Sequence, residues 1–114
     1  MEFNPKRHGF IANLIARCNG FEWDRGNSGK NWIGHQVSDK EAEQVFVCVP
    51  LKFADDPKHS QIEPRYLALG KTRENRLQFV AFTIRGLRMT DRAGKIRIIS
   101  ARDMNARDKK DYAE

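Results

Sequence analysis

The amino-acid sequence predicts an α+β domain in which two helices pack on a roughly four-stranded antiparallel sheet and a short helix ends the chain. Three observations support this fold class. An amphipathic helical pattern lies in the first half of the chain, strand patterns fill the second half, and a polar helical segment comes last. Because two helices cover only one face of a sheet well, we expect the other face to stay open as a binding surface.

Composition limits the class of protein. A chain of 114 residues has room for one domain, and 39% hydrophobic and 32% charged residues are typical of a globular protein. The net charge of +6 favours a polyanionic partner, with nucleic acid first and an acidic protein or an anionic membrane next. Residues 1–20 are predicted to be an N-terminal extension with a short helix around Ile11–Ala16, and residues 21–114 a single domain.

The cellular compartment follows from what the sequence does not contain. No stretch has the pattern of a signal peptide or a membrane span, so we expect a cytoplasmic protein without membrane contact. Cys18 and Cys48 form no C-x-x-C pair, and His8, His35 and His59 lack metal-ligand spacing. We therefore expect no disulfide framework, no metal and no other cofactor.

The domain is predicted to begin with a short strand and two helices. The strand covers Phe21–Trp23, and Asp24 is expected to cap a helix over Arg25–Gly34. A capping box at Ser38–Glu41 starts the second helix, which Pro50 ends. Its apolar residues recur at helical spacing: Ala42, Val45, Phe46 and Val49.

Strand patterns follow this second helix. They cover Leu51–Ala54, Arg65–Lys71, Leu77–Arg85 and Lys95–Ala101. Their connections are short enough for antiparallel hairpins. Asn105–Tyr112 is then expected to form the final polar helix, with Asn105 as its cap.

Several motifs, in this order, resemble the BrnT toxins. They are Phe21-Glu22-Trp23-Asp24; Lys30-Asn31 with His35 and Val37-Ser38; Glu43–Phe46; Asp56-Pro57 with His59-Ser60, Glu63, Arg65-Tyr66 and Gly70; and Arg97–Arg102, before a charged helix with Tyr112. Five motifs in sequence form a specific signal, which covers Phe21 to Glu114. The first twenty residues and the loop Arg85–Gly94 are longer than is usual in the family.

The resemblance implies a fold similar to the RelE toxins and an endoribonuclease of the mRNA interferase type. It also implies the toxin half of a bacterial type II toxin–antitoxin pair. The expected partner is a BrnA-like antitoxin with a ribbon–helix–helix part, which forms a heterotetramer with the toxin. Promoter DNA would be contacted only through that antitoxin, because no helix of this chain has the pattern of a DNA recognition helix.

RNA can be cut without a metal, because its own 2′-hydroxyl attacks the neighbouring phosphorus. The protein then supplies a base, an acid and cations for the phosphorane. Histidine is the residue type most easily tuned for proton transfer at neutral pH, which makes His59 a candidate. Glu63 would hold His59 or act as the base, and Arg65 would bind phosphate bidentately. The alternative interpretation is that His59 and Glu63 lie on a solvated turn and that Arg65 pairs with an acidic neighbour.

Arg97 is the fourth candidate catalytic residue. By strand alternation Arg97 and Arg102 are predicted to point to opposite sheet faces, with Ser100 on the Arg102 face. We expect Arg97 on the open face, because Arg102 lies at the strand end beside the final helix. Arg85, before the long loop, and Arg102 are candidate RNA-binding residues.

Two further RNA-binding candidates lie at the first helix of the domain. Lys30 would contact a phosphate and His35 would carry a second proton, although a solvated helix face is the favoured interpretation of Lys30. Trp23 is expected in the core. The competing hypotheses are a non-catalytic basic RNA-binding module, which would bind in a salt-sensitive way without cleavage, and a pure protein-interaction module.

Overall fold

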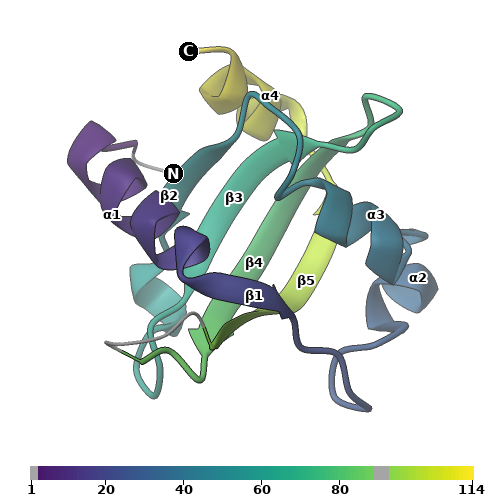
Figure 1. The fold of residues 1–114 in the computed structure, drawn as a ribbon. Coiled ribbons are helices and arrows are strands. Elements are labelled where there is room, and N and C mark those ends of the chain that lie inside the picture. The colour runs from purple at the N-terminus through teal and green to yellow at the C-terminus, as the bar shows by residue number, and fades with distance from the viewer. Residues whose placement is uncertain (1–2, 89–92) are drawn as a thin grey trace.

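The computed structural model describes residues 3–88 and 93–114, and within these ranges five strands form one mixed sheet in the order β1-β5-β4-β3-β2 (Figure 1). The strands are β1 (Cys18–Phe21), β2 (Lys52–Asp55), β3 (Tyr66–Lys71), β4 (Leu77–Arg85) and β5 (Gly94–Asp103). β2 to β5 form an antiparallel meander, as predicted, and β1 pairs in parallel with β5. The prediction of a purely antiparallel sheet of about four strands is therefore wrong.

The N-terminal residues form a longer helix than expected. Helix α1 covers Pro5–Ala16, whereas the sequence predicted a helix only from Ile11. The Asn4 side chain caps it by accepting from the backbone N–H of Lys6 and Arg7, and Pro5 occupies the first helical position. Ile11 is fully buried and belongs to the main core, so α1 packs on the sheet beside β2 (Figure 1).

The predicted helix over Arg25–Gly34 is wrong in its first half. Residues 25–29 form turns, and helix α2 covers only Lys30–His35. Gly29 has a φ of 77°, a left-handed conformation that interrupts a right-handed helix. Asp24 caps a turn instead of a helix, because its carboxylate accepts from the backbone N–H of Gly26.

The capping box of the next helix is confirmed. Helix α3 covers Asp39–Gln44; the Ser38 hydroxyl accepts from the Glu41 N–H, and the Ser38 N–H donates to the Glu41 carboxylate, both at 3.1 Å. The helix ends at Gln44, and turns fill the segment before Pro50. The apolar residues identified by their spacing nevertheless contribute to the core, since Val45 is fully buried and Phe46 packs against the core.

The final helix is close to its prediction. Helix α4 covers Ala106–Ala113, and Asn105 caps it in a second capping box, in which Asp108 is the reciprocal partner. The Tyr112 hydroxyl donates to the Pro50 carbonyl, which fastens the helix to the segment before β2. No helix among the described residues is long and apolar enough to cross a membrane.

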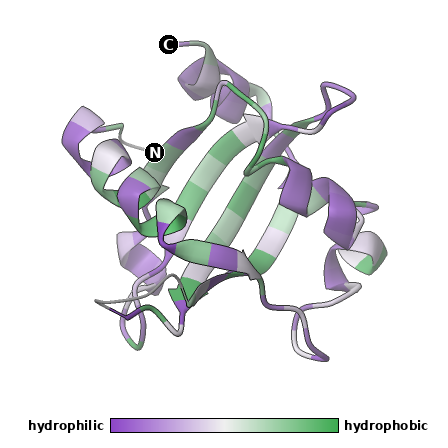
Figure 2. Ribbon diagram, in the orientation of Figure 1, coloured by the Kyte–Doolittle hydropathy of each residue, from purple (hydrophilic) through white to green (hydrophobic). Residues whose placement is uncertain are grey.

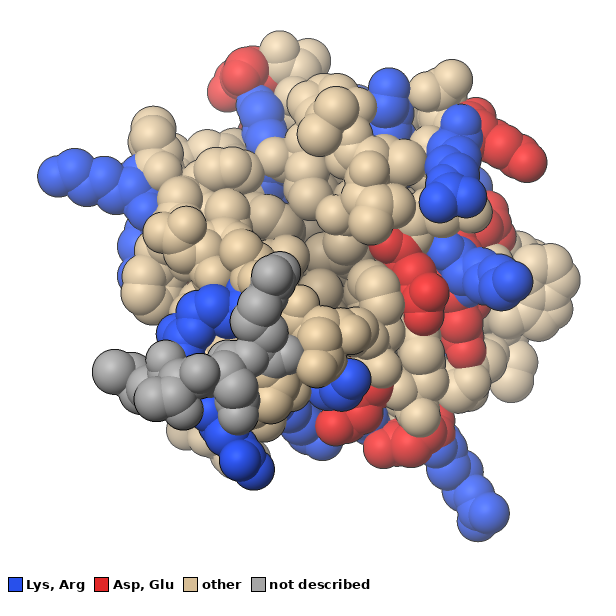
Figure 3. Space-filling model, viewed as in Figure 1, with Lys and Arg blue, Asp and Glu red and all other residues tan. Residues whose placement is uncertain are grey.

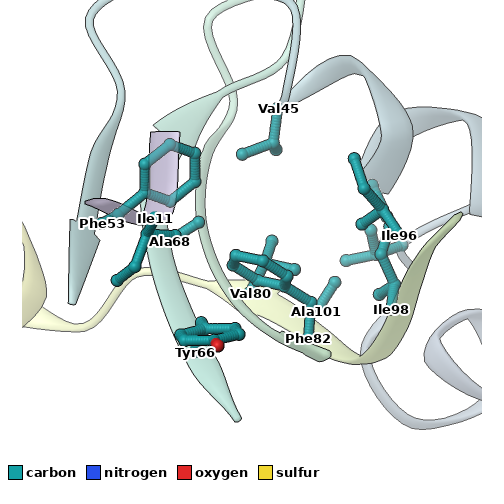
Figure 4. Close-up of a cluster of buried hydrophobic side chains, with 12 residues drawn as sticks. Ile11, Val45, Phe53, Tyr66, Ala68, Val80, Phe82, Ile96, Ile98 and Ala101 are labelled. Carbon is teal, nitrogen blue, oxygen red and sulfur yellow. The ribbon is translucent and has the colours of Figure 1, made fainter. Parts of the chain in front are cut away.

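One sheet face forms the hydrophobic core with α1 and the segment that contains α3. Its aromatic centre is Phe82, which contacts Phe46, Phe53 and Tyr66 with ring centroids 5.0–5.8 Å apart. Figure 4 shows Phe53, Tyr66 and Phe82 of the strands in one cluster with Ile11, Val45, Ile96 and Ile98. Hydrophobic residues follow the strands, whereas the helices are largely hydrophilic outside (Figure 2). Trp23 is half-buried against this core, as expected.

A β-bulge in β5 decides which residues face away from the core. Ala81 pairs with Ser100 while Phe82 pairs with Ile98, so Ile99 is an extra residue in the ladder. An extra residue reverses the alternation of the strand beyond it. The bulge therefore changes the side-chain directions that a regular strand would give.

Candidate functional site

We call the sheet face opposite the core the open face. It carries half-buried side chains from three adjacent strands: Leu67, Phe79, Ala81, Ile99 and Ser100. The 3₁₀ helix η1 (Pro57–His59) and α4 border this face, because residues from both line its pockets. Figure 3 views the other side of the sheet, which α1 and α3 cover, and there most Lys and Arg side chains lie at the rim of the molecule.

A pocket of about 320 Å³ lies on the open face. His59 and Arg65 lie in its wall together with Asp56 and Ser100, above a floor of strand side chains. His59 and Arg65 come from the two ends of one loop, between η1 and β3. We call this space the His59 pocket.

Asp56 positions His59. The Nδ1 atom of His59 lies 2.9 Å from Oδ2 of Asp56, whose side chain is only 14% exposed, whereas the His59 side chain is 64% exposed. A carboxylate on Nδ1 fixes the orientation of the ring and leaves Nε2 for a reactant. The backbone supports this geometry, since the Asp56 carbonyl accepts from the His59 N–H and the Ser60 hydroxyl.

Arg65 brings an unused cationic group into the same pocket. Its Nε is buried, and within the described residues this atom has no hydrogen-bond partner. Its backbone is held at both ends, because its N–H donates to the Ser60 hydroxyl and its carbonyl accepts from the Asp56 N–H. A buried N–H without a partner costs free energy, so an anion that accepts from it would be favoured.

The structure places Glu63 away from His59. Glu63 pairs with Arg85, whose Nη2 lies 3.1 Å from its Oε1. Arg85 also contacts Glu22 at 3.3 Å. Two of the residues expected to act on RNA, Glu63 and Arg85, therefore bind each other, and Asp56 takes the position on His59 that the sequence suggested for Glu63.

Arg97 belongs to the same set of ion pairs. Its guanidinium lies 2.9 Å from Glu22 and 2.9 Å from Asp24, and its side chain is only 12% exposed. The hydrogen bond from Arg97, helped by the Gly26 N–H, lowers the pKa of Asp24. We call the group Glu22, Asp24, Glu63, Arg85 and Arg97 the ion-pair network; it joins β4 and β5 to the segment after β1.

The prediction that Arg97 and Arg102 face opposite sides of the sheet is wrong. Arg97 pairs with Thr83 and Arg102 with Phe79, and these β4 residues are four apart and so share a face. The bulge at Ile99 is the reason. Arg102 covers the Phe79 ring at 4.2 Å and pairs with Asp108 at 2.7 Å, so it too is engaged within the protein.

The two remaining RNA-binding candidates lie elsewhere. Lys30 and His35 are exposed on α2, and neither lines a pocket of the open face. The short helix they occupy is fixed to β5 through Asn31, whose side-chain oxygen accepts from the Ala101 N–H at 3.0 Å. The His59 pocket is thus built without them.

Comparison with known proteins adds one finding. A family model described as the ribonuclease toxin BrnT of type II toxin–antitoxin systems matches residues 23–108, which is most of the chain. The chain belongs to the BrnT family. Membership in BrnT confirms the resemblance seen in the motifs and implies a ribonuclease toxin with an antitoxin partner. No curated protein matches the chain.

The part that matches BrnT contains the whole His59 pocket and the ion-pair network except Glu22, whereas α1 and β1 precede it. In the described part of the chain, no three His, Cys, Asp or Glu side chains are grouped to hold a metal ion. Sequence reasoning missed the role of Asp56. Its signal was present, because an acid three residues before His59, with Pro57 between them to start a turn, brings the two side chains together.

Proposed function

We propose that this BrnT protein is an mRNA interferase that cleaves RNA in the His59 pocket by attack of the substrate's own 2′-hydroxyl, without a metal. The observation that carries the proposal is the buried Arg65 Nε, which has no partner among the described residues and lies in one pocket with His59. A phosphodiester is the anion that a ribonuclease must hold, and it would accept this hydrogen bond.

In this mechanism His59 is the general base. Nε2 takes the 2′-hydroxyl proton, and Asp56 stabilises the imidazolium that forms. Arg65 stabilises the charge that develops on the phosphorane oxygens. The 5′ oxygen takes its proton from water as the bond to phosphorus breaks. One general acid–base group is worth about 10²–10⁴-fold in rate, so an incomplete set of acid and base is enough for a slow toxin.

Glu63, Arg85 and Arg97 have a positioning role in this proposal. Each is engaged in the ion-pair network, which fixes the strands beside the pocket. Arg102, covering Phe79, shapes the floor that the pocket shares. These residues would affect cleavage through the geometry of the pocket instead of through contact with the reacting atoms.

The proposal also includes the partner and the compartment. The family implies an antitoxin; we propose a BrnA-like antitoxin with a ribbon–helix–helix part, bound in a heterotetramer that covers the open face and alone contacts promoter DNA. A net charge of +6 suits both an RNA substrate and an acidic covering segment. The toxin would act in the cytoplasm, where its RNA substrate is found.

The test is cleavage of RNA by the purified protein in EDTA. We expect cleavage to persist in EDTA, to be lost in His59→Ala and Arg65→Ala, and to continue in Glu63→Ala and Arg97→Ala. Binding of RNA without cleavage by the wild type would favour the non-catalytic binding module. Equal cleavage by all four variants would show that the nuclease activity comes from another site or from a contaminant.

A further inference from the structure

A second and larger pocket adjoins the His59 pocket. Its volume is about 670 Å³, and it shares Asp56, Leu67 and Phe79 with the smaller pocket. It extends along the open face towards α4 and the start of α1, because Arg107 and Arg7 also line it. The proposed reaction in the His59 pocket makes no use of this space.

The acidic residues of the larger pocket are mostly neutralised by contacts within the protein. Asp55 is bound by Arg7 through two hydrogen bonds of 2.7 Å, which lower the pKa of Asp55. Asp108 accepts from Arg102 at 2.7 Å and from the Asn105 N–H, and Asp56 holds His59. Asp111, in the last turn of α4, completes the acidic lining.

Two cationic side chains of this pocket are not paired with an acid in this way. Lys58 on η1 and Arg107 on α4 are both exposed, and neither forms an ion pair within residues 3–88 and 93–114. They come from the two elements that border the open face, and so lie in the same pocket wall as Asp56 and Asp108. Unpaired cations in a wall whose acids are neutralised favour an anionic ligand group.

The floor of the larger pocket is apolar. Leu67 and Phe79 continue into it from the His59 pocket, and Arg102 packs over the Phe79 ring. An aromatic ring beside an arginine plane is a surface on which nucleic-acid bases stack in single-strand binding proteins. The larger pocket thus combines an apolar floor for a base with two cations for a phosphate.

We infer that the larger pocket is a second nucleotide subsite, which holds the RNA nucleotide next to the scissile phosphate. This inference rests on the proposed function of the His59 pocket. The base lies on Leu67 and Phe79, and Lys58 and Arg107 hold the adjoining phosphate. RNA then runs along the open face towards α4 and away from the ion-pair network, so Lys58 and Arg107 determine substrate length.

The experiment measures binding of non-cleavable RNA to the full chain. A 2′-O-methyl dinucleotide, with one phosphodiester, and a 2′-O-methyl tetranucleotide are titrated by fluorescence anisotropy. The wild type is expected to bind the tetranucleotide more tightly. Arg107→Ala and Lys58→Ala should each weaken tetranucleotide binding about fivefold or more, with little change for the dinucleotide. For single strands, each lost phosphate contact should also lower the slope of log affinity against log salt by about 0.7.

Lys109→Ala is the matched control, since Lys109 is exposed on the same helix but does not line the pocket. Tetranucleotide affinity that is equal in wild type, Arg107→Ala and Lys58→Ala would overturn the subsite. An equal loss in Lys109→Ala would also overturn it, because the effect would then be one of net charge. Failure of the proposed function gives a different result, namely no cleavage by the wild type whatever the oligonucleotide affinities are.

Discussion

The β3 side and the β5 side of the open face each carry an arginine, and the two arginines are in opposite electrostatic states. On the β3 side, Arg65 has a buried Nε–H without a hydrogen-bond partner among the described residues. On the β5 side, Arg97 is shared between two carboxylates, and its side chain is only 12% exposed. An arginine whose donors are already used stabilises the fold, whereas one with a spare buried donor can hold a ligand. The difference between Arg65 and Arg97 lies in their hydrogen-bond partners and not in the residue type.

The largest effect on cleavage is expected from the loss of His59. We expect His59→Ala to reduce RNA cleavage by about 10²–10⁴-fold, because the base for the 2′-hydroxyl proton is removed. The measurement is single-turnover cleavage with the toxin in excess. Since His59 is exposed, thermal unfolding of the variant should match the wild type. A loss below tenfold would show that another group takes the proton.

Variants of Arg65 distinguish the effect of its positive charge from the effect of its planar geometry. Arg65→Ala should reduce the single-turnover rate by about 10²–10³-fold, as for loss of one preorganised donor to the transition state. Arg65→Lys keeps the charge but not the planar fork, so it should recover only part of the rate. Full activity in Arg65→Lys would mean that a point charge is sufficient and that the buried Nε has no role.

A core variant provides the reference for effects that come only from stability. Ile11→Ala removes a fully buried side chain on α1, and should lower the free energy of unfolding by about 2–5 kcal/mol. The measurement is denaturant unfolding, with cleavage assayed where the variant is still folded. Cleavage by the folded variant should equal that of the wild type. A loss of less than 1 kcal/mol would indicate that α1 packs only loosely on the domain.

The Arg97→Ala variant should lose stability and keep its cleavage activity, which is the reverse of the His59 and Arg65 variants. It leaves Asp24 without its cation and Glu22 with Arg85 alone, so the melting temperature should fall, while the cleavage rate of folded protein should stay within about threefold of wild type. Thermal unfolding and single-turnover cleavage are measured on the same sample. A hundredfold loss of cleavage with an unchanged melting temperature would move Arg97 into the catalytic site.

The smallest expected effect is a pH dependence. Arg97 and the Gly26 N–H lower the pKa of Asp24 in the folded protein, so the ionised Asp24 stabilises the fold. That stabilisation is fully present above the unfolded-state pKa, about 3.9, and is lost as the pH falls through the lower folded pKa. The difference in melting temperature between wild type and Arg97→Ala should therefore be constant near neutral pH and shrink below about pH 4. A difference that grows in acid would contradict this assignment.

Local chemistry made much of the fold predictable from the sequence. Ser38 and Asn105 cap their helices as expected, because a capping box depends on residues only three apart. The limits of β4 match the prediction, since apolar residues on both faces identify a central strand. Local patterns also gave the family motifs and brought His59 and Arg65 together as candidates.

The failures depended on tertiary contacts. β1 is placed by pairing with β5, a partner some 75 residues later in the sequence, which no local pattern shows. No glycine or proline near Ile99 indicates the bulge in the sequence. The bulge nevertheless reverses the side-chain directions on which the assignment of Arg97 and Arg102 depended. The pairing of carboxylates with cations is likewise decided by the assembled sheet, so Asp56 holds His59 in place of Glu63, which pairs with Arg85.

Helix α1 covers an edge of the sheet that would otherwise be unpaired. The Phe53 N–H of edge strand β2 donates to Nδ1 of His8 at 3.1 Å, and the two rings stack. An exposed strand edge next to an uncovered apolar surface is a template for aggregation. Shortening the chain so that it begins at β1 would remove this cover and expose the core where Ile11 packs. Such a chain should precipitate or associate through β2, so the seventeen residues before β1 determine the solubility of this toxin.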